Sequence, residues 1–214
     1  MKSAGRLALA ALLLLPAAAR AQEPHPPPHV EEKSEWEFNA SVYGYFVPQD
    51  RDYGQPTVTA DHGGLHLEAR YNYEGIDTGS AWVGWNFGFG EKLRIDGTLM
   101  AGGVFGNMRA VAPGYHLTVT LGNFELYSEG EYVFDTTGNP SNNFFYNWTQ
   151  LGYSPLEWLT VGLASQKTKA YQTDLDIQRG VFVGFTYGSW SLSVYVFNFG
   201  WESPTVVSAL AFSF

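Results

Sequence analysis

The sequence predicts an all-β fold: an antiparallel, up-and-down transmembrane β-barrel of about twelve strands. Three observations support this prediction. Apolar and polar residues alternate through most of the chain, which is the period of a strand with two different faces. Mean hydropathy is only −0.15, so apolar residues must be hidden by alternation rather than gathered in long runs. The N-terminus also has the layout of an export signal.

Residues 1–21 have the three parts of a secretory signal peptide. Lys2 and Arg6 supply positive charge, an apolar run follows from residue 7, and residues 19–21 (Ala-Arg-Ala) place small side chains where a signal peptidase cleaves. The apolar run ends after 13 residues, which is too short for a membrane-spanning helix of about 20 residues. We therefore expect cleavage after Ala21 and export of the remainder.

The mature chain is strongly acidic. Cleavage removes three basic residues and no acid, which leaves 9 basic against 21 acidic residues and a formal charge of −12. Such a chain repels nucleic acid, so we expect no nucleic-acid partner. Because the chain has no cysteine, it has no disulfides, thiolate metal ligands or cysteine nucleophile.

The stretch 64–74 defines the expected register. One face carries Leu65, Leu67 and Ala69, and the other carries His66, Glu68 and Arg70. A slip by one residue would turn the charged face into lipid, so the alternation fixes which side faces outward. The same alternation recurs in 36–47, 81–89, 93–105, 115–121 and 124–134.

A soluble β-sandwich also alternates and is the main structural alternative. Three features favour the barrel. Aromatic residues number 35 of 214, and many fall near strand ends, where the interfacial girdles of barrels lie. Long charged side chains occupy mid-strand positions on one face while the other face stays free of charge. The terminal Phe214 has no role in a sandwich.

The C-terminus ends on phenylalanine and has large apolar residues at alternate positions, with Ser208 as the exception: Val206, Ser208, Leu210, Phe212 and Phe214. This pattern resembles the last strand of outer-membrane β-barrels, and residues 35–214 resemble small porin-like proteins of that class. The resemblance implies that Phe212 and Phe214 form the insertion signal. It also implies a Gram-negative outer-membrane location, with outer-membrane lipid, periplasmic chaperones and the barrel-insertion machinery as partners.

Turn signals give the strand count. Five short turns alternate with six longer polar stretches, which makes twelve strands and leaves both termini on the periplasmic side. Ten strands is the alternative if 55–62 or 108–121 is irregular, since Pro113 indicates a bulge or an early loop. The stretch 144–153 assigns cleanly to neither face. The expected strands are 35–47, 55–62, 64–74, 80–90, 92–105, 108–121, 123–134, 144–153, 158–167, 174–187, 190–200 and 205–214.

Residues 22–34 are rich in proline and histidine. Such a segment cannot build a core, so we expect a flexible periplasmic tail between the signal peptide and the barrel at 35–214. His25 and His29 have no helix or strand to direct them, so we expect no metal site there.

Catalytic groups are few. His66 and His116 are the only histidines expected in the lumen, and no serine motif flanks either of them. A lumen histidine within a polar network is the expected role, so we predict no catalytic residue, no metal and no cofactor. A barrel hydrolase acting on envelope lipid or peptide is the second alternative to the channel function predicted in the next paragraph.

Charged residues on the inner face suggest a function. Long side chains should fold over the glycine-rich stretch 84–90, and we expect an ion-pair cluster there that fills or constricts the lumen. Acids outnumber bases on this face, so an open pore would prefer cations. The predicted function is a porin-like channel for small hydrophilic solutes, and the first alternative is a closed structural or adhesive barrel that displays loops. The predicted lumen residues are Glu68, Arg70, Arg94, Asp96, Glu125, Glu129 and Glu131.

Overall fold

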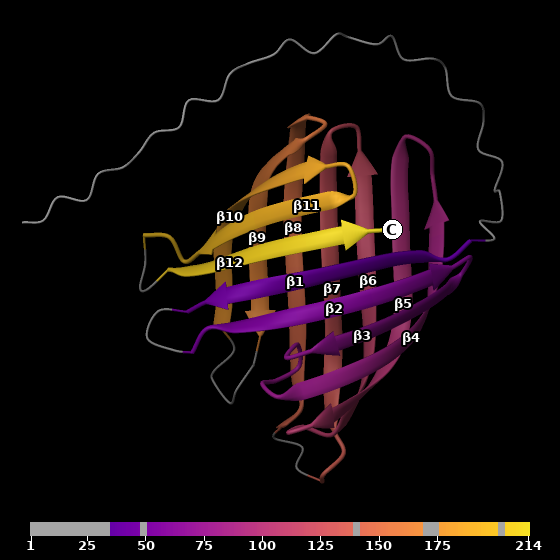
Figure 1. The fold of residues 1–214 in the computed structure, drawn as a ribbon, viewed down its shortest axis with the longest axis vertical. Helices are drawn as coiled ribbons and strands as arrows, with labels where there is room; N and C mark the ends of the chain where they lie inside the picture. The colour runs from indigo at the N-terminus through magenta and orange to yellow at the C-terminus, as the bar shows by residue number, and fades with distance from the viewer. Residues whose placement is uncertain (1–34, 48–50, 139–141, 169–175, 201–203) are drawn as a thin grey trace, which may run out of the picture. The chain divides into compact units, whose positions relative to one another are not determined.

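The computed structural model describes residues 35–214 except 48–50, 139–141, 169–175 and 201–203. The expected signal peptide and tail therefore lie outside the described residues. The described residues form twelve strands, as the alternation predicts (Figure 1). They are β1 (Glu37–Phe46), β2 (Tyr53–His62), β3 (Leu65–Tyr71), β4 (Thr78–Phe89), β5 (Leu93–Gly106), β6 (Ala110–Leu121), β7 (Phe124–Asp135), β8 (Phe144–Leu156), β9 (Leu159–Thr168), β10 (Asp176–Tyr187), β11 (Trp190–Phe197) and β12 (Thr205–Ser213).

Strand pairing closes the sheet into a barrel. Each strand pairs antiparallel with the next along the chain, and β1 pairs with β12 from Asn39↔Ser213 to Phe46↔Val206. Phe38 and Phe214 extend this pairing by exchanging two backbone hydrogen bonds of 2.9 Å. Closure leaves no sheet edge without a partner strand in the described part of the chain, and the ten-strand alternative is wrong. None of the described residues forms a helix long and apolar enough to cross a membrane.

The turns at one end of the barrel are short because glycine allows them. Gly63, Gly122 and Gly188 have φ near +58°, +57° and +58°, the left-handed region that residues with a Cβ rarely adopt. Each sits in a two-residue connection, and every two-residue connection follows an even-numbered strand, as the strand bounds show. The short turns therefore lie at the same end of the barrel as the C-terminus, and the longer loops lie at the other end.

Pro113 and Pro155 differ in their effect on strand register. The sequence predicts an interruption at Pro113, but β6 continues through it and keeps one register with β7 on both sides. The direct pairs with β7 skip only Ala112 and Pro113, because proline has no N–H to donate. The register shift lies instead in β8, between Tyr153 and Leu156, next to Pro155.

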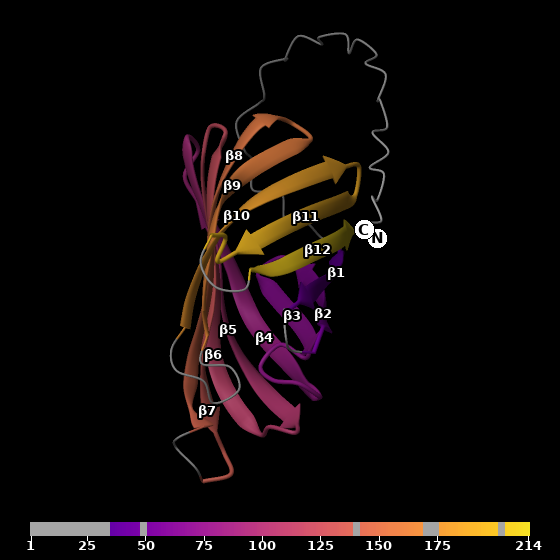
Figure 2. The same cartoon turned by 90° about the vertical axis from the view of Figure 1, so that its left-hand side faces the viewer.

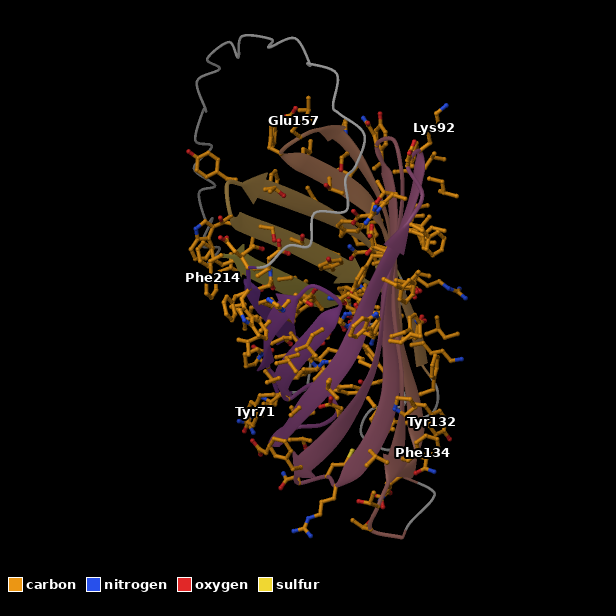
Figure 3. The ribbon with its side chains drawn as sticks, turned by 90° about the vertical axis from the view of Figure 1, so that its right-hand side faces the viewer. Tyr71, Lys92, Tyr132, Phe134, Glu157 and Phe214 are labelled. Atoms are coloured by element: carbon orange, nitrogen blue, oxygen red, sulfur yellow. The ribbon has the colours of Figure 1, made fainter. Side chains whose placement is uncertain are left out.

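The outer surface of the barrel is an apolar belt. The side chains of Trp85, Leu99 and Leu163 are 64%, 63% and 61% exposed, far more than a solvent-facing sheet tolerates over many residues. Exposed aromatic residues lie toward both ends, including Tyr71, Tyr132 and Phe134 at the long-loop end and Phe214 beside the short turns (Figure 3). Such a belt with aromatic girdles is what a lipid-facing barrel surface requires.

One outward area on β6–β8 is polar, which explains why 144–153 lacks clean alternation. Asn147 Nδ2 donates to Tyr115 Oη at 3.0 Å and to Ser128 Oγ at 3.2 Å, and Thr149 Oγ1 donates to Asn147 Oδ1 at 3.1 Å. These groups satisfy one another, so they meet the requirement that polar groups facing hydrocarbon find internal partners.

Two walls of the barrel face each other closely enough for their side chains to meet. β10–β12 and β1–β3 cross in front of the steeper β5–β8, and the edge-on view separates these two walls (Figures 1 and 2). Inward side chains from the two walls meet in part of the space between them. Trp148 on β8 contacts the rings of Tyr43, Tyr195 and Phe197 from the opposite wall at centroid distances of 5.9, 4.9 and 5.3 Å.

A charged side chain placed in the apolar belt should destabilise the folded barrel more than the same side chain placed in the lumen. Leu163 lies at the middle of β9 and faces outward, so Leu163→Arg should destabilise the folded barrel by about 2–4 kcal/mol. Reversible denaturant titration in lipid vesicles measures this loss. Thr118→Arg, on the inner face of β6, is the matched control and should cost clearly less. Equal costs at both positions would contradict the assignment of the two faces.

Candidate functional site: a charged network and cavity in the barrel lumen

A cavity of about 560 Å³ occupies the lumen from the short-turn end inward. Glu35, Glu37 and Gly63 line its mouth, where β1 begins and β2 ends. Its inner end meets a group of aromatic side chains from both walls. Those aromatic residues are Tyr43, Tyr45, Tyr73, Tyr127, Tyr146 and Trp148.

The cavity wall is acidic. Among the described residues, five carboxylates line it, and no lysine or arginine does. The five are Glu35, Glu37, Asp61, Glu68 and Glu129. A low-dielectric wall carrying an excess of one sign of charge concentrates ions of the opposite sign.

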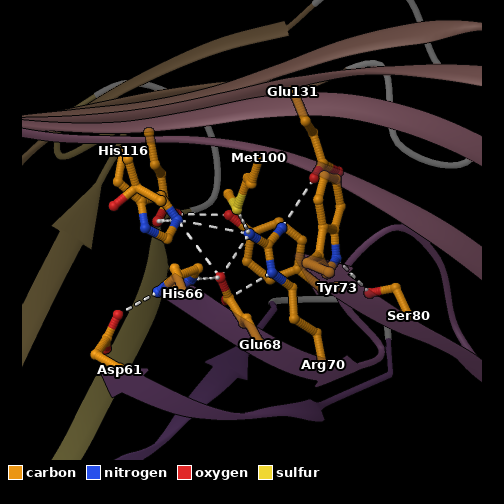
Figure 4. A network of polar contacts seen from close by, with 12 residues as sticks. Asp61, His66, Glu68, Arg70, Tyr73, Ser80, Met100, His116 and Glu131 are labelled. Carbon is orange, nitrogen blue, oxygen red and sulfur yellow. Dashed lines mark hydrogen bonds and ion pairs between the residues drawn. The ribbon is translucent and has the colours of Figure 1, made fainter. Parts of the chain in front are cut away.

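Arg70 on β3 is the centre of a buried network that joins the two walls (Figure 4). Its Nε donates to Glu68 Oε1 at 2.7 Å, and its Nη1 donates to Glu131 Oε2 on β7 at 2.9 Å. The guanidinium also lies 4.2 Å and 4.5 Å from the ring centroids of Tyr73 and Trp82. The planar fork of arginine suits this site because it serves two carboxylates and two rings at once.

His66 is held on both ring nitrogens. Nδ1 lies 2.8 Å from Asp61 Oδ1, and Nε2 lies 3.2 Å from Glu68 Oε2. Asn86 Nδ2 donates to the same Asp61 oxygen at 2.6 Å, which fixes that carboxylate in turn. His116 of β6 reaches the same place from the opposite wall, and its ring meets that of His66 edge-on with centroids 5.8 Å apart.

Glu129 on β7 stands beside His116 and is fixed by two phenols. Tyr73 Oη donates to its Oε1 at 2.6 Å, and Tyr127 Oη donates to its Oε2 at 2.6 Å. His116 Nε2 lies 3.8 Å from Glu129 Oε2 and also 3.8 Å from Glu68 Oε2. The imidazole therefore lies between two carboxylates that belong to different walls.

Glu74 belongs to the loop after β3 and closes the network toward the long-loop end. Ser80 Oγ donates to its Oε1 at 2.6 Å, and Trp82 Nε1 donates to Ser80 Oγ at 3.0 Å. Burial raises the pKa of the Glu74 carboxyl above its usual value. Among the described residues, Glu74 Oε2 and Glu131 Oε1 are the buried side-chain polar atoms without a hydrogen-bond partner.

The remaining residues singled out from the sequence lie elsewhere. Arg94 and Asp96 form their own pair at 2.6 Å, folded over Gly88 near the short turns and half exposed. Within the described part of the chain, no ion pair joins them to Glu68 or Arg70. Glu125 is exposed at the start of β7, away from the network.

Phe212 and Phe214 of the expected insertion signal lie at the closing seam. Their rings are 5.4 Å apart, and Phe38 stacks on Phe214 at 5.6 Å.

Some residues of the network could not be found from the sequence, because only closure brings them together. Tyr73 and Trp82 flank Arg70, and the Tyr127 hydroxyl fixes Glu129, yet no sequence spacing connects them. The sequence signal for Trp82 and Tyr127 is the alternation along β4 and β7, which places both side chains on the inner face. The polar neighbours described for His66 and His116 are carboxylates and Arg70 rather than a serine hydroxyl, so the hydrolase alternative gains no support.

Comparisons with known proteins find the fold rather than a family. No family model matches the chain, and no curated protein matches its sequence. Among solved structures, the "KdgM porin" aligns with a TM-score of 0.58 at 12% identity, covering 82% of this chain and 99% of that one. The "KdgM porin in complex with disordered oligogalacturonate" aligns at 0.54 and 12%, covering 83% and 99%. The chain therefore shares its barrel fold with solved porins.

The network predicts unequal roles for two arginines of the inner face. The Arg70 side chain is 2% exposed, whereas that of Arg94 is 52% exposed. Arg70→Met leaves Glu68 and Glu131 buried without their cation, so it should cost about 3–5 kcal/mol. Arg94→Met breaks a solvated pair and should change the free energy of unfolding far less. Denaturant unfolding in vesicles compares them, and a similar loss for both variants would contradict the network's importance.

Proposed function

We propose that this protein is an outer-membrane channel of the porin type, which passes small hydrophilic solutes and prefers cations. Its termini lie on the periplasmic side in this proposal, so the cavity opens toward the periplasm. The observation that carries the proposal is the lumen cavity, lined in the described part of the chain by five carboxylates without a lysine or arginine.

Three further features support the membrane location. The outer surface is an apolar belt with aromatic residues toward its ends, as a lipid-facing barrel needs. Short turns at the end that carries the C-terminus and longer loops at the other end are the arrangement of bacterial outer-membrane barrels. The fold is shared with two solved porin structures.

The acidic wall supports the cation preference through elementary electrostatics. Carboxylates at the mouth attract cations and repel anions, and the low dielectric of the barrel wall strengthens both effects. One of the similar solved structures is a porin in complex with an oligogalacturonate, which is an anionic sugar. An acidic lumen is unsuited to such a ligand, so we propose neutral and cationic solutes for this chain.

A closed structural barrel is the second candidate, and one observation favours it. The inner end of the cavity is closed by side chains that touch across the lumen, such as Trp148 against Tyr43 and Tyr195 Oη donating to Gln150 Oε1 at 2.9 Å. In the channel proposal these side chains form the constriction that solutes pass. In the closed-barrel proposal they are a permanent core.

Planar-bilayer recording under a KCl gradient tests the channel. We expect discrete conductance steps and a reversal potential displaced toward that of K⁺. Glu35→Gln with Glu37→Gln should reduce this cation preference, because both carboxylates line the cavity mouth. Glu91→Gln is the matched control: it lies exposed at a short turn outside the cavity and should leave selectivity unchanged.

The constriction gives a second test. Trp148→Ala removes the ring at the centre of the cross-lumen contacts and should raise single-channel conductance, at a stability cost of about 3–5 kcal/mol. Trp85→Ala, an outward tryptophan, is the control and should leave conductance as it is. If neither the parent nor Trp148→Ala conducts, the channel proposal fails and the closed barrel is favoured.

A further inference from the structure

The cross-wall contact between β3 and the β6–β7 pair brings together a set of metal-ligating side chains. His66 and Glu68 come from β3, His116 from β6 and Glu129 from β7. Ligand atoms of the first three all lie within 4.8 Å of one another, and the fourth approaches His116 to 3.8 Å. The sequence predicts no metal site, and the two walls that supply these residues are far apart along the chain.

The spacing of these atoms fits a tetrahedral ion. Ligands at about 2.0–2.2 Å from Zn²⁺ stand about 3.4 Å from one another along the edges of a tetrahedron. Glu68 Oε2 lies 3.2 Å from His66 Nε2 and 3.8 Å from His116 Nε2. These two distances differ from the tetrahedral edge by only a few tenths of an ångström.

Each ligand residue but His116 is also oriented by a second residue, as metal sites require. A metal-binding histidine usually donates its other ring N–H to a carboxylate, and Asp61 occupies that position on His66 Nδ1 at 2.8 Å. Arg70 Nε holds Glu68 Oε1 at 2.7 Å and so aims Oε2 at the histidines. Tyr73 and Tyr127 hold the two oxygens of Glu129.

The charge of the network favours an added cation. Five carboxyl groups share the space with one guanidinium: Asp61, Glu68, Glu74, Glu129 and Glu131 against Arg70. Buried carboxylates are costly unless paired. Two carboxylate oxygens in this network have no hydrogen-bond partner among the described residues, which is consistent with a shortage of positive charge.

The Arg70 guanidinium occupies part of the space that a bound metal ion would need. Its Nη2 lies 3.2 Å from Glu68 Oε2 and 3.5 Å from His116 Nε2. The guanidinium is rigid and planar, so Nη2 moves away only when the whole group shifts, which lengthens its bonds from Nε to Glu68 Oε1 and from Nη1 to Glu131 Oε2. A route also exists, because all four ligand residues line the cavity that reaches the short-turn mouth.

We propose that a divalent transition-metal ion of the Zn²⁺ class binds at this point and clasps the two walls together. The ligands are His66 Nε2, Glu68 Oε2, His116 Nε2 and Glu129 Oε2. Two imidazoles select Zn²⁺, Co²⁺, Ni²⁺ or Cu²⁺ over Mg²⁺ and Ca²⁺, which prefer oxygen ligands alone. The site does not depend on conduction, so it stands or falls separately from the channel proposal.

Metal titration of the full chain, folded in detergent, tests the site. Zn²⁺ should bind at one ion per chain within the barrel and raise the thermal midpoint of unfolding, because it binds the folded state. Co²⁺ should give the visible absorption of a tetrahedral site with nitrogen ligands. Asp61→Asn, which weakens the contact that orients His66 and keeps all four proposed ligands, should weaken Zn²⁺ binding about 10- to 100-fold.

Two variants remove ligands, and two controls keep them. His66→Gln and His116→Gln should each abolish the Co²⁺ spectrum and the Zn²⁺-dependent thermal shift. His62→Gln changes an exposed histidine of the neighbouring strand and should leave both unchanged. The double variant His25→Gln and His29→Gln removes the tail histidines and should also leave them unchanged.

Circular dichroism and heat-modifiable electrophoretic mobility establish that each variant is folded before it is compared. Absence of Zn²⁺ binding by the folded parent chain overturns the proposal. So does binding that survives both ligand variants, or binding that disappears with the tail histidines. A Co²⁺ spectrum lost only in His66→Gln and His116→Gln supports the proposed set.

Discussion

The antiparallel pairing of β1 with β12 is the constraint on which the rest of this structure depends. In hydrocarbon every backbone N–H and C=O needs an internal partner, and only a closed sheet supplies one to every strand. Closure leaves each inward side chain in a confined space and each outward one against the apolar surroundings. A one-residue slip anywhere would exchange these two environments, so backbone pairing and side-chain alternation enforce the same register.

Closure also decides which side chains meet. In an open sheet, Arg70 of β3 would interact only with β2 and β4. In this barrel, the wall containing β3 faces β7, and Arg70 reaches Glu131 at 2.9 Å. Buried ion pairs gain little over apolar packing, but a single arginine shared by two carboxylates strongly disfavours a shifted arrangement of the walls. The network therefore stabilises the relative position of the walls more than the strands themselves.

The fold could be predicted from the sequence because it rests on a local signal. Alternation at period two and turn residues both involve only neighbouring residues, so the twelve strands and most of their ends could be predicted from them. Pro113 misleads because one missing hydrogen bond does not break a paired strand. The site could be predicted only in part. Alternation along β3 and β6 places His66 and His116 on the inner face. The distance of 5.8 Å between their ring centroids depends on how the walls cross, which no local sequence pattern contains.

The two halves of the lumen have opposite physical characters, and this difference connects structure with function. Toward the short turns the lumen is a polar cavity lined by carboxylates, among them the exposed Glu35 and Glu37. At its inner end the space is filled by rings such as Trp148 and by the Arg70 network, where charge is tolerated only in bonded groups. In the channel proposal, cations drawn into the cavity meet His116 at its inner end, beside carboxylates from both walls. In that proposal a solute must displace this cross-wall contact to pass, so the strength of the contact would set how readily the lumen opens. In the closed-barrel proposal the same contact is a permanent part of the core.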